Sequence, residues 1–465
     1  MNERKNICVV GLGYVGLPLA ALSAIQGKKT IGFDTNQNVI DTLKAGQCHI
    51  KDEILEASVQ QALGTDLFFA TNDVADLHNA DAYLICVPTP INNAKEPDLT
   101  PLLSSIETIA PYLNEDDLVV VESTVFPGTC EQEVIPLLES LTNLKVGEQL
   151  HLAHCPERVN PGDVFWHSGN IPRVLGATTE QGAEIAANLY STLLDGPVYK
   201  VNEIKDTIKP KFGLNDQGEL TVANVALGSI TMMRSIRDAE AVKAMENTVR
   251  DVNIAFVNEL AKISDVLDLD VVDIIDGMTT KPFGKGPFYP GVGVGGHCIA
   301  VDPEWLKAAS KKAGYMPEII QLSRETNNYM PSYAVSLLQD SLNEIGKPVK
   351  DTQVAILGVS YKRNVDDPRE SPFFDVKKLL ENKGADLKVY DSWVSTENNV
   401  KDLKSALSGS TAVMIVTEHS DLIEEFNTLD LDAMGIKVII DGRNCLDELS
   451  FKKSNIIYHG IGRRA

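Results

Sequence analysis

The sequence predicts an α/β protein with two Rossmann-like domains, each a doubly wound parallel sheet, joined by a central helical domain. Three observations support this: short apolar runs alternate with helical periodicity near the N-terminus, a long helical pattern occupies the middle, and a second series of apolar runs follows. Strands that alternate with helices are typical of a parallel sheet covered by helices. The 465 residues divide into an N-terminal domain, an insertion of unknown role, a central domain and a C-terminal domain: residues 1–200, 201–235, 236–345 and 346–465.

The first element is an apolar run, residues 7–10, that leads into a glycine turn, Gly11-Leu-Gly13-Tyr14-Val15-Gly16. Helical periodicity follows, and a second apolar run, residues 30–33, ends at Asp34. The first glycine allows a tight turn, the second lets the backbone approach a pyrophosphate, and the third lets the helix pack closely on the strand. Asp34 stands where an acid accepts hydrogen bonds from a ribose, and no arginine follows it. The pattern predicts NAD rather than NADP, with a plain glycine turn as the alternative.

The next elements extend this first sheet and then lead into helices. Apolar runs at 82–87 and 118–121 are followed by turn signals, which in the first case begin with Pro88-Thr89-Pro90. Residues 236–268 carry apolar side chains at three- to four-residue steps, which indicates one long helix. A Gly/Pro-rich loop precedes a further helical pattern over residues 304–345, with breaks near Gly314 and Pro317.

The C-terminal third resembles the first domain. Its predicted strands are residues 353–358, 387–391, 412–416 and 437–441. An intact glycine fingerprint is missing, because Val359, Ser360 and Tyr361 follow Gly358. We therefore expect a second α/β domain without a second dinucleotide turn.

Composition excludes several classes of protein. The formal net charge is −23, so we expect no non-specific binding to nucleic acid or to an anionic membrane. No apolar run approaches the roughly 18 residues of a spanning helix, and the N-terminus does not resemble a secretory leader, so the expected location is cytoplasmic. The seven cysteines are scattered and contain no C-x-x-C pair, which disfavours a disulfide framework and a metal site.

Cys298 is the first candidate for chemistry. It follows a glycine-rich loop that leaves it open to a ligand, and Asp302 lies four residues further on. A position at a helix N-terminus would stabilise its thiolate. A small core residue in a tight bend is an equal alternative. His297 is a weaker candidate for an activating base, because neighbouring side chains usually point apart.

Two other patterns have functional and structural explanations. Lys243 and Asn247 are spaced to share one face of the central helix, either as polar groups that need partners or as a solvated stripe. Glu157 and Arg158 lie in a loop bounded by prolines, and the purely structural explanation is a surface ion pair between them. The alternative is a catalytic carboxylate beside an anion-binding guanidinium.

Taken together, these segments resemble the UDP-glucose/GDP-mannose dehydrogenase family over nearly the whole chain. The matching motifs occur in one order: Gly11 to Pro18, Val87 to Pro90, Glu122 to Val125, Pro156-Glu157-Arg158, Lys243 with Glu246-Asn247, Gly295 to Cys298, and Asp366 to Ser371. Pro-Glu-Arg, Thr280-Lys-Pro-Phe and Phe288-Tyr-Pro-Gly are most similar to the branch that oxidises UDP-N-acetylhexosamines to uronates, of the kind used for surface polysaccharides and other glycans. Enzymes for UDP-glucose, the alternative substrate, usually carry Phe where this chain has Arg158.

The resemblance implies a four-electron oxidation of the sugar C6 with two NAD. Cys298 would be the nucleophile that holds the intermediate as a thiohemiacetal and then as a thioester. Lys243 and Asn247 would stabilise the charge on the C6 oxygen. Asp302 would handle water and protons, and Glu157 would act as the base in hydrolysis. Thr124 matches a threonine that orders water near the nicotinamide.

The resemblance also implies the binding residues and the assembly. Those for the cofactor are Gly11, Gly13, Tyr14, Val15, Gly16, Asp34, Pro88, Thr89, Thr124 and Arg369. Those for the UDP-sugar are Glu157, Arg158, Lys243, Asn247, Phe288, Tyr289, Gly291, Lys362 and Arg443. The central helices and the family predict a homodimer or a higher homo-oligomer.

Two departures from the family pattern stand out. Residues 202–235 look like extra sequence, which suits a surface hairpin, an oligomer contact or a lid. Position 161 is Pro where UDP-glucose enzymes often have a second acid, so hydrolysis would depend more on Glu157. The sequence does not distinguish UDP-GlcNAc from UDP-ManNAc. A two-electron hydroxyacid dehydrogenase and a non-catalytic Rossmann protein are the alternatives from other classes.

Overall fold

A computed structural model describes residues 4–91, 97–159, 165–202, 211–214, 220–223, 226–281, 287–296 and 298–464. The chain forms two compact units, Met1–Met245 and Glu246–Ala465. Within the described residues, no helix is both long enough and apolar enough to cross a lipid bilayer.

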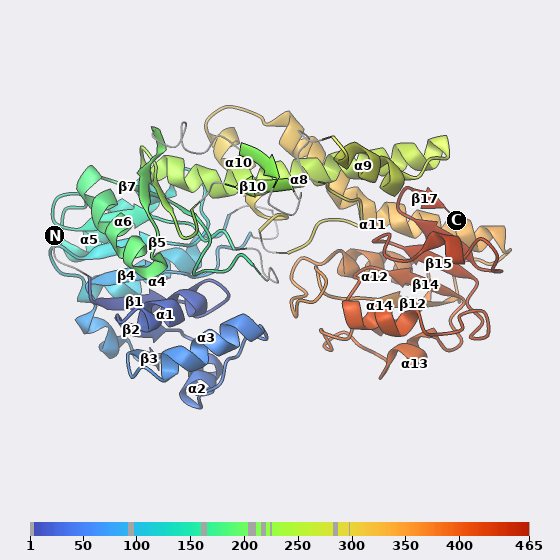
Figure 1. The fold of residues 1–465 in the computed structure, drawn as a ribbon, viewed down its shortest axis with the longest axis horizontal. Coiled ribbons are helices and arrows are strands. Elements are labelled where there is room, and N and C mark those ends of the chain that lie inside the picture. The colour runs from blue at the N-terminus through green and yellow to red at the C-terminus, as the bar shows by residue number, and fades with distance from the viewer. Residues whose placement is uncertain are drawn as a thin grey trace. The chain divides into compact units, whose positions relative to one another are not determined.

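The first unit is built on a large sheet (Figure 1). Its strands are β1 (Asn6–Val10), β2 (Lys29–Phe33), β3 (Phe68–Thr71), β4 (Ala82–Ile85), β5 (Leu118–Val121), β6 (His151–His154), β7 (Arg173–Ala177), β8 (Val198–Lys200) and β11 (Ile230–Met232). The strand order is β3-β2-β1-β4-β5-β6-β7-β11-β8, and only the β6–β7 pair is antiparallel. The order reverses beside β1, and ligands of such sheets bind at the carboxyl ends of the strands around this point.

Helices cover both faces of this sheet. They are α1 (Gly16–Ile25), α2 (Gln37–Lys44), α3 (Glu53–Leu63), α4 (Thr100–Ile109), α5 (Ile135–Thr142) and α6 (Glu180–Leu194), with short turns η1 (Val74–Asn79), η2 (Ala110–Tyr112) and η3 (Cys130–Val134). Successive side chains of β1 point to opposite faces. Ile7 and Val9 pack with α1, α3 and α6, whereas Cys8 and Val10 pack with α4 and α5. The predicted doubly wound fold is confirmed.

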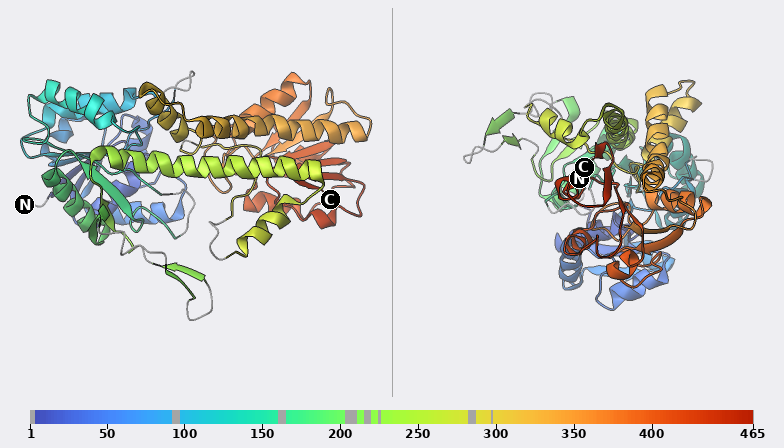
Figure 2. Two further views of the ribbon diagram at one scale, coloured as in Figure 1. Left: turned by 90° about the horizontal axis from the view of Figure 1, so that it is seen from above. Right: turned by 90° about the vertical axis from the view of Figure 1, so that its right-hand side faces the viewer.

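The segment predicted as an insertion contains two different structures. Strands β9 (Lys211–Leu214) and β10 (Leu220–Ala223) form a separate antiparallel pair. This pair stands apart from the main sheet (Figure 2). Strand β11, in contrast, lies between β7 and β8 within the main sheet. The end of the segment is thus part of the first unit.

The second unit contains the rest of helix α8 (Ile236–Leu267), which begins in the first unit, and a six-stranded sheet. Its other helices are α9 (Val271–Thr279), α10 (Asp302–Lys312), α11 (Glu318–Glu344), α12 (Pro372–Asn382), α13 (Leu403–Leu407) and α14 (Ser420–Phe426), with the short turn η4 (Glu448–Ser450). Its strands are β12 (Gln353–Leu357), β13 (Asp386–Tyr390), β14 (Ala412–Ile415), β15 (Val438–Asp441), β16 (Ile457–Gly460) and β17 (Arg463–Arg464). Their order is β13-β12-β14-β15-β16-β17, and only β16–β17 is antiparallel.

The second sheet is also covered on both faces, as predicted. Val354 and Ile356 of β12 pack with α11 and α12, and Ala355 and Leu357 pack with α13 and α14. The predicted break between α10 and α11 is confirmed, because Gly314 has a φ of +87° and α11 begins directly after Pro317.

The C-terminal residues are bound to helices of the same unit. A Cβ atom on Gly462 would lie 2.7 Å from the Cα of Ala261, so only glycine fits against α8. The Arg463 guanidinium contacts Asp270 at 2.7 Å, Asp273 at 3.3 Å and Glu448 at 3.0 Å. This part of the fold therefore joins the end of the chain to the start of α9.

Candidate active site

The glycine turn between β1 and α1 has the geometry of a dinucleotide cradle. Gly11 has a φ of +92°, and its Cβ would lie 2.9 Å from the Cys86 carbonyl oxygen. A Cβ on Gly16 would lie 1.8 Å from the Gly11 oxygen, so the helix starts directly against the turn. At Gly13, no heavy atom of the described residues lies within 4 Å of an added Cβ, which leaves the space that a pyrophosphate needs. In the same part of the chain no side chain caps α1, so its first N–H groups are directed at this space.

Asp34 closes the turn from the end of β2. Its Oδ2 accepts a hydrogen bond from the Leu12 N–H at 2.8 Å, and its Oδ1 accepts one from Asn36 N–H at 2.8 Å. These bonds fix the carboxylate beside the glycine turn, as an NAD ribose requires. His49, which sequence reasoning missed, lies near Leu12 and Asp34, and burial lowers its pKa.

The remaining predicted cofactor residues of this unit lie at strand ends. Pro88 and Thr89 follow β4, and Thr124 follows β5. Ser123 joins these two ends, because its hydroxyl lies 2.6 Å from the Val87 carbonyl oxygen. Tyr14 and Pro88 are exposed, whereas Thr89 is buried and Thr124 is half-buried.

Glu157 belongs to a buried ionic cluster. Its Oε1 accepts hydrogen bonds from the N–H groups of Arg158 at 2.7 Å and Val159 at 2.9 Å. Its Oε2 accepts one from Arg173 at 2.6 Å, and Arg173 also donates to Glu122 at 2.8 Å. The Arg158 guanidinium donates to the Pro172 carbonyl oxygen at 3.0 Å. Glu157 is therefore held by Arg173 and by two backbone N–H groups, and not by the surface ion pair that the sequence analysis considered as the structural alternative.

The cluster continues away from Glu157 into the core. Tyr190 of α6 donates its hydroxyl proton to Glu122, and the Arg173 guanidinium lies 5.4 Å from the centre of the Tyr190 ring. Arg173, Glu122 and Tyr190 are essentially inaccessible to solvent. One cation therefore lies between two carboxylates in a medium that strengthens both attraction and repulsion.

Replacing Glu122 by Gln is expected to change how stability depends on pH. Burial raises the pKa of Glu122 from 4.5 to about 7, against the attraction of Arg173 and with the repulsion of Glu157. The folded state therefore holds this proton more tightly than the unfolded state. The resulting stabilisation is complete below pH 4.5 and is lost as the pH rises through 7. Glu122→Gln has no such proton to lose. As the pH rises from 4.5 to above 7, its unfolding free energy should therefore increase by about 3 kcal/mol relative to that of the wild type.

Urea unfolding of both proteins between pH 4.5 and 8 measures this difference. His154 titrates with the opposite sign, because burial lowers its pKa to about 3 and its stabilising contribution is lost as the pH falls. The comparison of the two proteins removes this shared term. A stability difference that is constant with pH would contradict the prediction.

Lys243 is positioned by the start of α8. Three residues earlier, the buried Glu240 accepts hydrogen bonds from the N–H groups of Gly128 at 2.5 Å and Cys130 at 2.8 Å. These bonds join the first turns of α8 to the loop that follows β5. Lys243 is itself buried, and Asn247, one turn further along the helix, is buried as well. The solvated stripe considered from the sequence is therefore wrong.

Asn247 contacts the segment that carries the candidate nucleophile. Its side-chain amide donates to the Asp302 carboxylate at 2.6 Å. The N–H of Asp302 donates at 2.8 Å to the Cys298 carbonyl oxygen, so Cys298 lies in the turn that opens α10. Cys298 is exposed, whereas Asp302 is buried. The alternative of a buried core cysteine is therefore wrong. An exposed thiol is thus adjacent to a helix N-terminus, an arrangement that favours a thiolate.

The predicted substrate loop before Cys298 packs within the second unit. The N–H of Gly291 donates to Asn258 at 3.0 Å, and a Cβ on Gly291 would lie 2.8 Å from the Arg443 guanidinium. Arg443 also pairs with Glu418 at 2.9 Å. Close contact between the loop and Arg443 suits the binding of a diphosphate.

Phe288 and Tyr289 belong to the same loop, and the backbone of Arg369 contacts it. Phe288 packs against the core, and the Tyr289 hydroxyl donates to Asp276 at 2.6 Å. The N–H of Gly296 donates to the Arg369 carbonyl oxygen at 3.1 Å, and the Arg369 guanidinium pairs with Asp367 at 2.7 Å. That Arg369 contacts NAD stays a prediction.

The structure thus divides the predicted site residues between two units. The first unit contains Gly11, Gly13, Tyr14, Val15, Gly16, Asp34, Pro88, Thr89, Thr124, Glu157, Arg158 and Lys243, and the second contains Asn247, Phe288, Tyr289, Gly291, Cys298, Asp302, Lys362, Arg369 and Arg443. His297, Pro161 and residues 282–286, which the sequence analysis also considered, lie outside the described residues.

Sequence reasoning assigned no role to several residues that hold the site. Arg173, Glu122, Glu240 and Asn258 are all buried and contact predicted site residues or their loops. For two of them, Arg173 and Glu122, the sequence does contain a detectable signal. Arg173 opens an apolar strand and Glu122 directly follows one, and a charge at such a position needs a buried partner.

The glycine cradle, the acid at the end of β2 and the switch point of the sheet are those of an NAD-binding domain, the kind that dehydrogenases carry. The chain belongs to the UDP-glucose/GDP-mannose dehydrogenase family. Residues 5–194 match the family's NAD binding domain, residues 237–329 its central domain and residues 355–448 its UDP binding domain.

Known relatives agree with this assignment. The chain is 32% identical to the UDP-N-acetyl-D-mannosamine dehydrogenase of Pyrococcus horikoshii over 98% of this chain and 99% of the relative. It is 35% identical to the UDP-N-acetyl-D-glucosamine 6-dehydrogenase of Salmonella typhi over 85% of this chain and 84% of that relative. The solved structure of the Pyrococcus horikoshii UDP-D-ManNAc dehydrogenase matches with a TM-score of 0.85 at 32% identity, over 98% of this chain and 99% of that one.

Proposed function

We propose that this protein oxidises C6 of a UDP-N-acetylhexosamine, UDP-GlcNAc or UDP-ManNAc, to a carboxylate, with NAD as the oxidant. One observation carries the proposal. An exposed thiol, Cys298, lies in the turn directly before α10, whose first residue, Asp302, accepts a hydrogen bond from Asn247 at 2.6 Å. The relatives named above act, by their names, on the UDP derivatives of N-acetylmannosamine and N-acetylglucosamine.

The proposed reaction has two oxidations and one hydrolysis. In each oxidation NAD, when bound, accepts a hydride from C6 of the sugar. After the first, the Cys298 thiolate adds to the aldehyde carbon and the oxygen takes a proton, which gives a thiohemiacetal. Loss of the second hydride and of the hydroxyl proton gives a thioester. Water then attacks this carbon, the C–S bond breaks with its electron pair on sulfur, and a carboxylate leaves. One alcohol, two NAD and one water thus give one carboxylate, two NADH and three protons.

The chain's own residues have separate tasks in this scheme. Lys243 and Asn247, one turn apart on α8, stabilise negative charge on the C6 oxygen. Asp302, which accepts the hydrogen bond from Asn247, receives protons from water or from the sugar hydroxyl. Glu157 is the base for hydrolysis, and the hydrogen bonds from Arg173 and from two backbone N–H groups orient it. Thr124 orders a water molecule.

A panel of sugar nucleotides tests the proposal. NADH release is followed with UDP-GlcNAc, UDP-ManNAc, UDP-GalNAc, UDP-glucose and GDP-mannose, and NADH is counted per sugar consumed. We expect two NADH per sugar and the highest kcat/KM with UDP-GlcNAc or UDP-ManNAc. Preference for UDP-glucose would select the alternative substrate. One NADH per sugar would identify a two-electron dehydrogenase, and NAD binding without turnover would indicate a non-catalytic protein.

We also propose that two copies pair through α8. Val249, Phe256 and Ile263 are exposed and seven residues apart, and Leu267 extends the same apolar stripe. This spacing is that of a helix that packs along its length against another helix. In a dimer with a twofold axis, the stripe of one copy would pack against the stripe of the other, and both apolar surfaces would be removed from solvent.

Phe256→Glu is therefore expected to give a monomer. A charge at the centre of the stripe would be buried without a partner in the dimer, at a cost of several kcal/mol. Sedimentation velocity measures the change, and Arg250→Gln, at an exposed position of the same helix away from the stripe, is the control. A wild-type chain that sediments only as a monomer would reject the dimer.

A further inference from the structure

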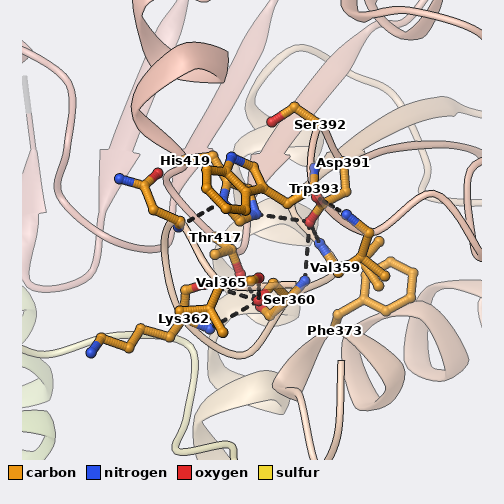
Figure 3. A network of polar contacts seen from close by, with 12 residues as sticks. Val359, Ser360, Lys362, Val365, Phe373, Asp391, Ser392, Trp393, Thr417 and His419 are labelled. Atoms are coloured by element: carbon orange, nitrogen blue, oxygen red, sulfur yellow. Dashed lines mark hydrogen bonds and ion pairs between the residues drawn. The ribbon is translucent and has the colours of Figure 1, made fainter. Parts of the chain in front are cut away.

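The loop between β12 and α12 is held by a buried polar network (Figure 3). Residues 359–367, here called the 359–367 loop, include Lys362, which is the proposed contact of the substrate's diphosphate. In Figure 3 the Lys362 side chain extends away from the network, while its backbone belongs to it. The residues that hold the loop are Asp391, after β13, and Thr417 and His419, after β14. None of these three was singled out from the sequence.

Asp391 is the centre of the network. Its Oδ2 accepts hydrogen bonds from the N–H groups of Val359 at 2.5 Å and Ser360 at 3.0 Å, and from His419 Nε2 at 3.0 Å. Its Oδ1 accepts two more from the N–H groups of Trp393 and Val394, both at 2.7 Å. Burial opposes the charge, but these donors outweigh it and lower the pKa of Asp391 to about 2. The carboxylate is therefore ionised and has five donors.

Asp391 occupies the position that Asp34 occupies in the first unit. Both follow the second strand of a βαβ turn, and both accept a hydrogen bond from the residue after the first glycine, Leu12 or Val359. The donors around Asp391 leave it no capacity for a ribose. Gly358 keeps a φ of +91°, but its Cβ would lie 2.5 Å from the Thr417 nitrogen. The second unit thus retains the turn and uses its acid to hold the loop.

His419 joins Asp391 to the far end of the loop. Its Nδ1 accepts a hydrogen bond from the Asn364 N–H at 2.8 Å, so this nitrogen is unprotonated and the proton is on Nε2, directed at Asp391. The ring is inaccessible to solvent and stacks on Trp393 with an angle of 12° between the planes. Asn364 has a φ of +56°, a left-handed conformation that asparagine adopts more readily than most residues, and its N–H is directed at this ring.

Two hydroxyl groups complete the support. Ser360 Oγ lies 2.6 Å from the Val365 carbonyl oxygen and 2.9 Å from that of Lys362. Thr417 donates its hydroxyl proton to the Ser360 carbonyl oxygen. Each of these bonds ends on the backbone of the 359–367 loop. The network therefore determines where the loop places its side chains.

We propose that Asp391 and His419 are positioning residues for substrate binding: they hold the 359–367 loop so that Lys362 meets the diphosphate of the UDP-sugar. This inference rests on the proposed function, because that function assigns the diphosphate to Lys362. Neither residue touches the substrate. The pair sets KM for the UDP-sugar and leaves kcat and NAD affinity unchanged.

Two conservative variants of His419 separate its two hydrogen bonds. Asn places an oxygen near the position of Nδ1 and keeps an acceptor for Asn364. Gln places an amide near Nε2 and keeps the donor to Asp391, but leaves the part-buried Asn364 N–H without its acceptor. We expect His419→Gln to raise the Kd for UDP about tenfold and His419→Asn to raise it no more than about threefold. UDP and NAD binding are measured by calorimetry on the full chain, and KM and kcat with the preferred sugar.

Controls distinguish loop positioning from general damage. His459→Gln changes another buried histidine of the same unit, at the end of β16, and should leave UDP binding unchanged. Lys362→Ala should weaken UDP binding directly. Hydrogen exchange measures the loop itself: the amide of Asn364 should exchange faster in His419→Gln than in wild type.

The outcomes separate the two proposals. Unchanged exchange and an unchanged Kd in His419→Gln, or an equal loss in His459→Gln, would overturn the positioning role. If UDP does not bind the wild-type chain, the proposed function fails, and the ligand part of this inference fails with it. A fall in kcat without a rise in KM would also contradict the inference.

Discussion

Alanine in place of Cys298 is expected to abolish formation of the carboxylate product while NAD and UDP still bind. Without the thiol, the aldehyde cannot be held as a thiohemiacetal, and the second oxidation has no covalent substrate. Complete oxidation should slow by roughly 10³-fold or more. Serine keeps the size of the side chain but is a far weaker nucleophile at neutral pH, so Cys298→Ser should lose the second oxidation as well.

Mass spectrometry of the products and the count of NADH per sugar measure this effect. Cys48→Ser is the matched control, because the Cys48 thiol donates to the Ile50 carbonyl oxygen, a contact that a serine hydroxyl can replace. The control should form the carboxylate at the wild-type rate. Two NADH per sugar at the wild-type rate in Cys298→Ala would falsify the covalent mechanism.

Arg173→Met is expected to destabilise the first unit by about 3–5 kcal/mol, which is a large part of a domain's stability. Arg173 is the cation between Glu122 and Glu157, at 2.8 and 2.6 Å, and it is inaccessible to solvent. Methionine keeps the apolar volume but leaves two buried carboxylates without a counter-charge. Any protein that remains folded should hydrolyse the thioester slowly, because Glu157 is no longer oriented.

Urea unfolding followed by circular dichroism measures the loss of stability. Arg237→Met removes the same side chain from an exposed pair with Glu131 and should cost less than about 1 kcal/mol. Adding Glu122→Gln to Arg173→Met removes one of the two carboxylates and should recover part of the loss. Equal effects of Arg173→Met and Arg237→Met would show that burial of the cluster does not determine its energy.

Most of the fold could be predicted because its strands are apolar on both faces. The runs at 118–121 and 412–416 match β5 and β14 to within a residue, and the long helical pattern matches α8. Continuous apolar runs are what a parallel sheet covered on both sides demands. The glycine turn was equally predictable, because Gly11 and Gly16 each meet a steric limit that only glycine satisfies, and Gly13 leaves open space beside the turn.

The strands that close the first sheet were not predictable in the same way. Strand β8 is only three residues long and largely exposed, and β11 lies next to it although about 30 residues separate them along the chain. A short edge strand has little apolar pattern to detect. Its position depends on pairing over a long sequence separation.

The supporting residues of the site were missed for a related reason. Arg173 and Glu157 are 16 residues apart, and His419 and Asp391 are 28 residues apart. Neither pair lies within one helix or one turn, so no local spacing predicts the contact. Sequence motifs identify groups that face a ligand, whereas the partners that orient them come from neighbouring strands of the sheet.

The contacts of Arg463 bear on how the protein is made. This side chain binds Asp270 across 193 residues of sequence, and Gly462 packs against Ala261 of α8. Both contacts form only after the residues up to position 463 have left the ribosome. During translation Ala261 of α8 and Asp270 at the start of α9 therefore lack these partners, and incomplete packing of this kind makes a folding intermediate prone to aggregation.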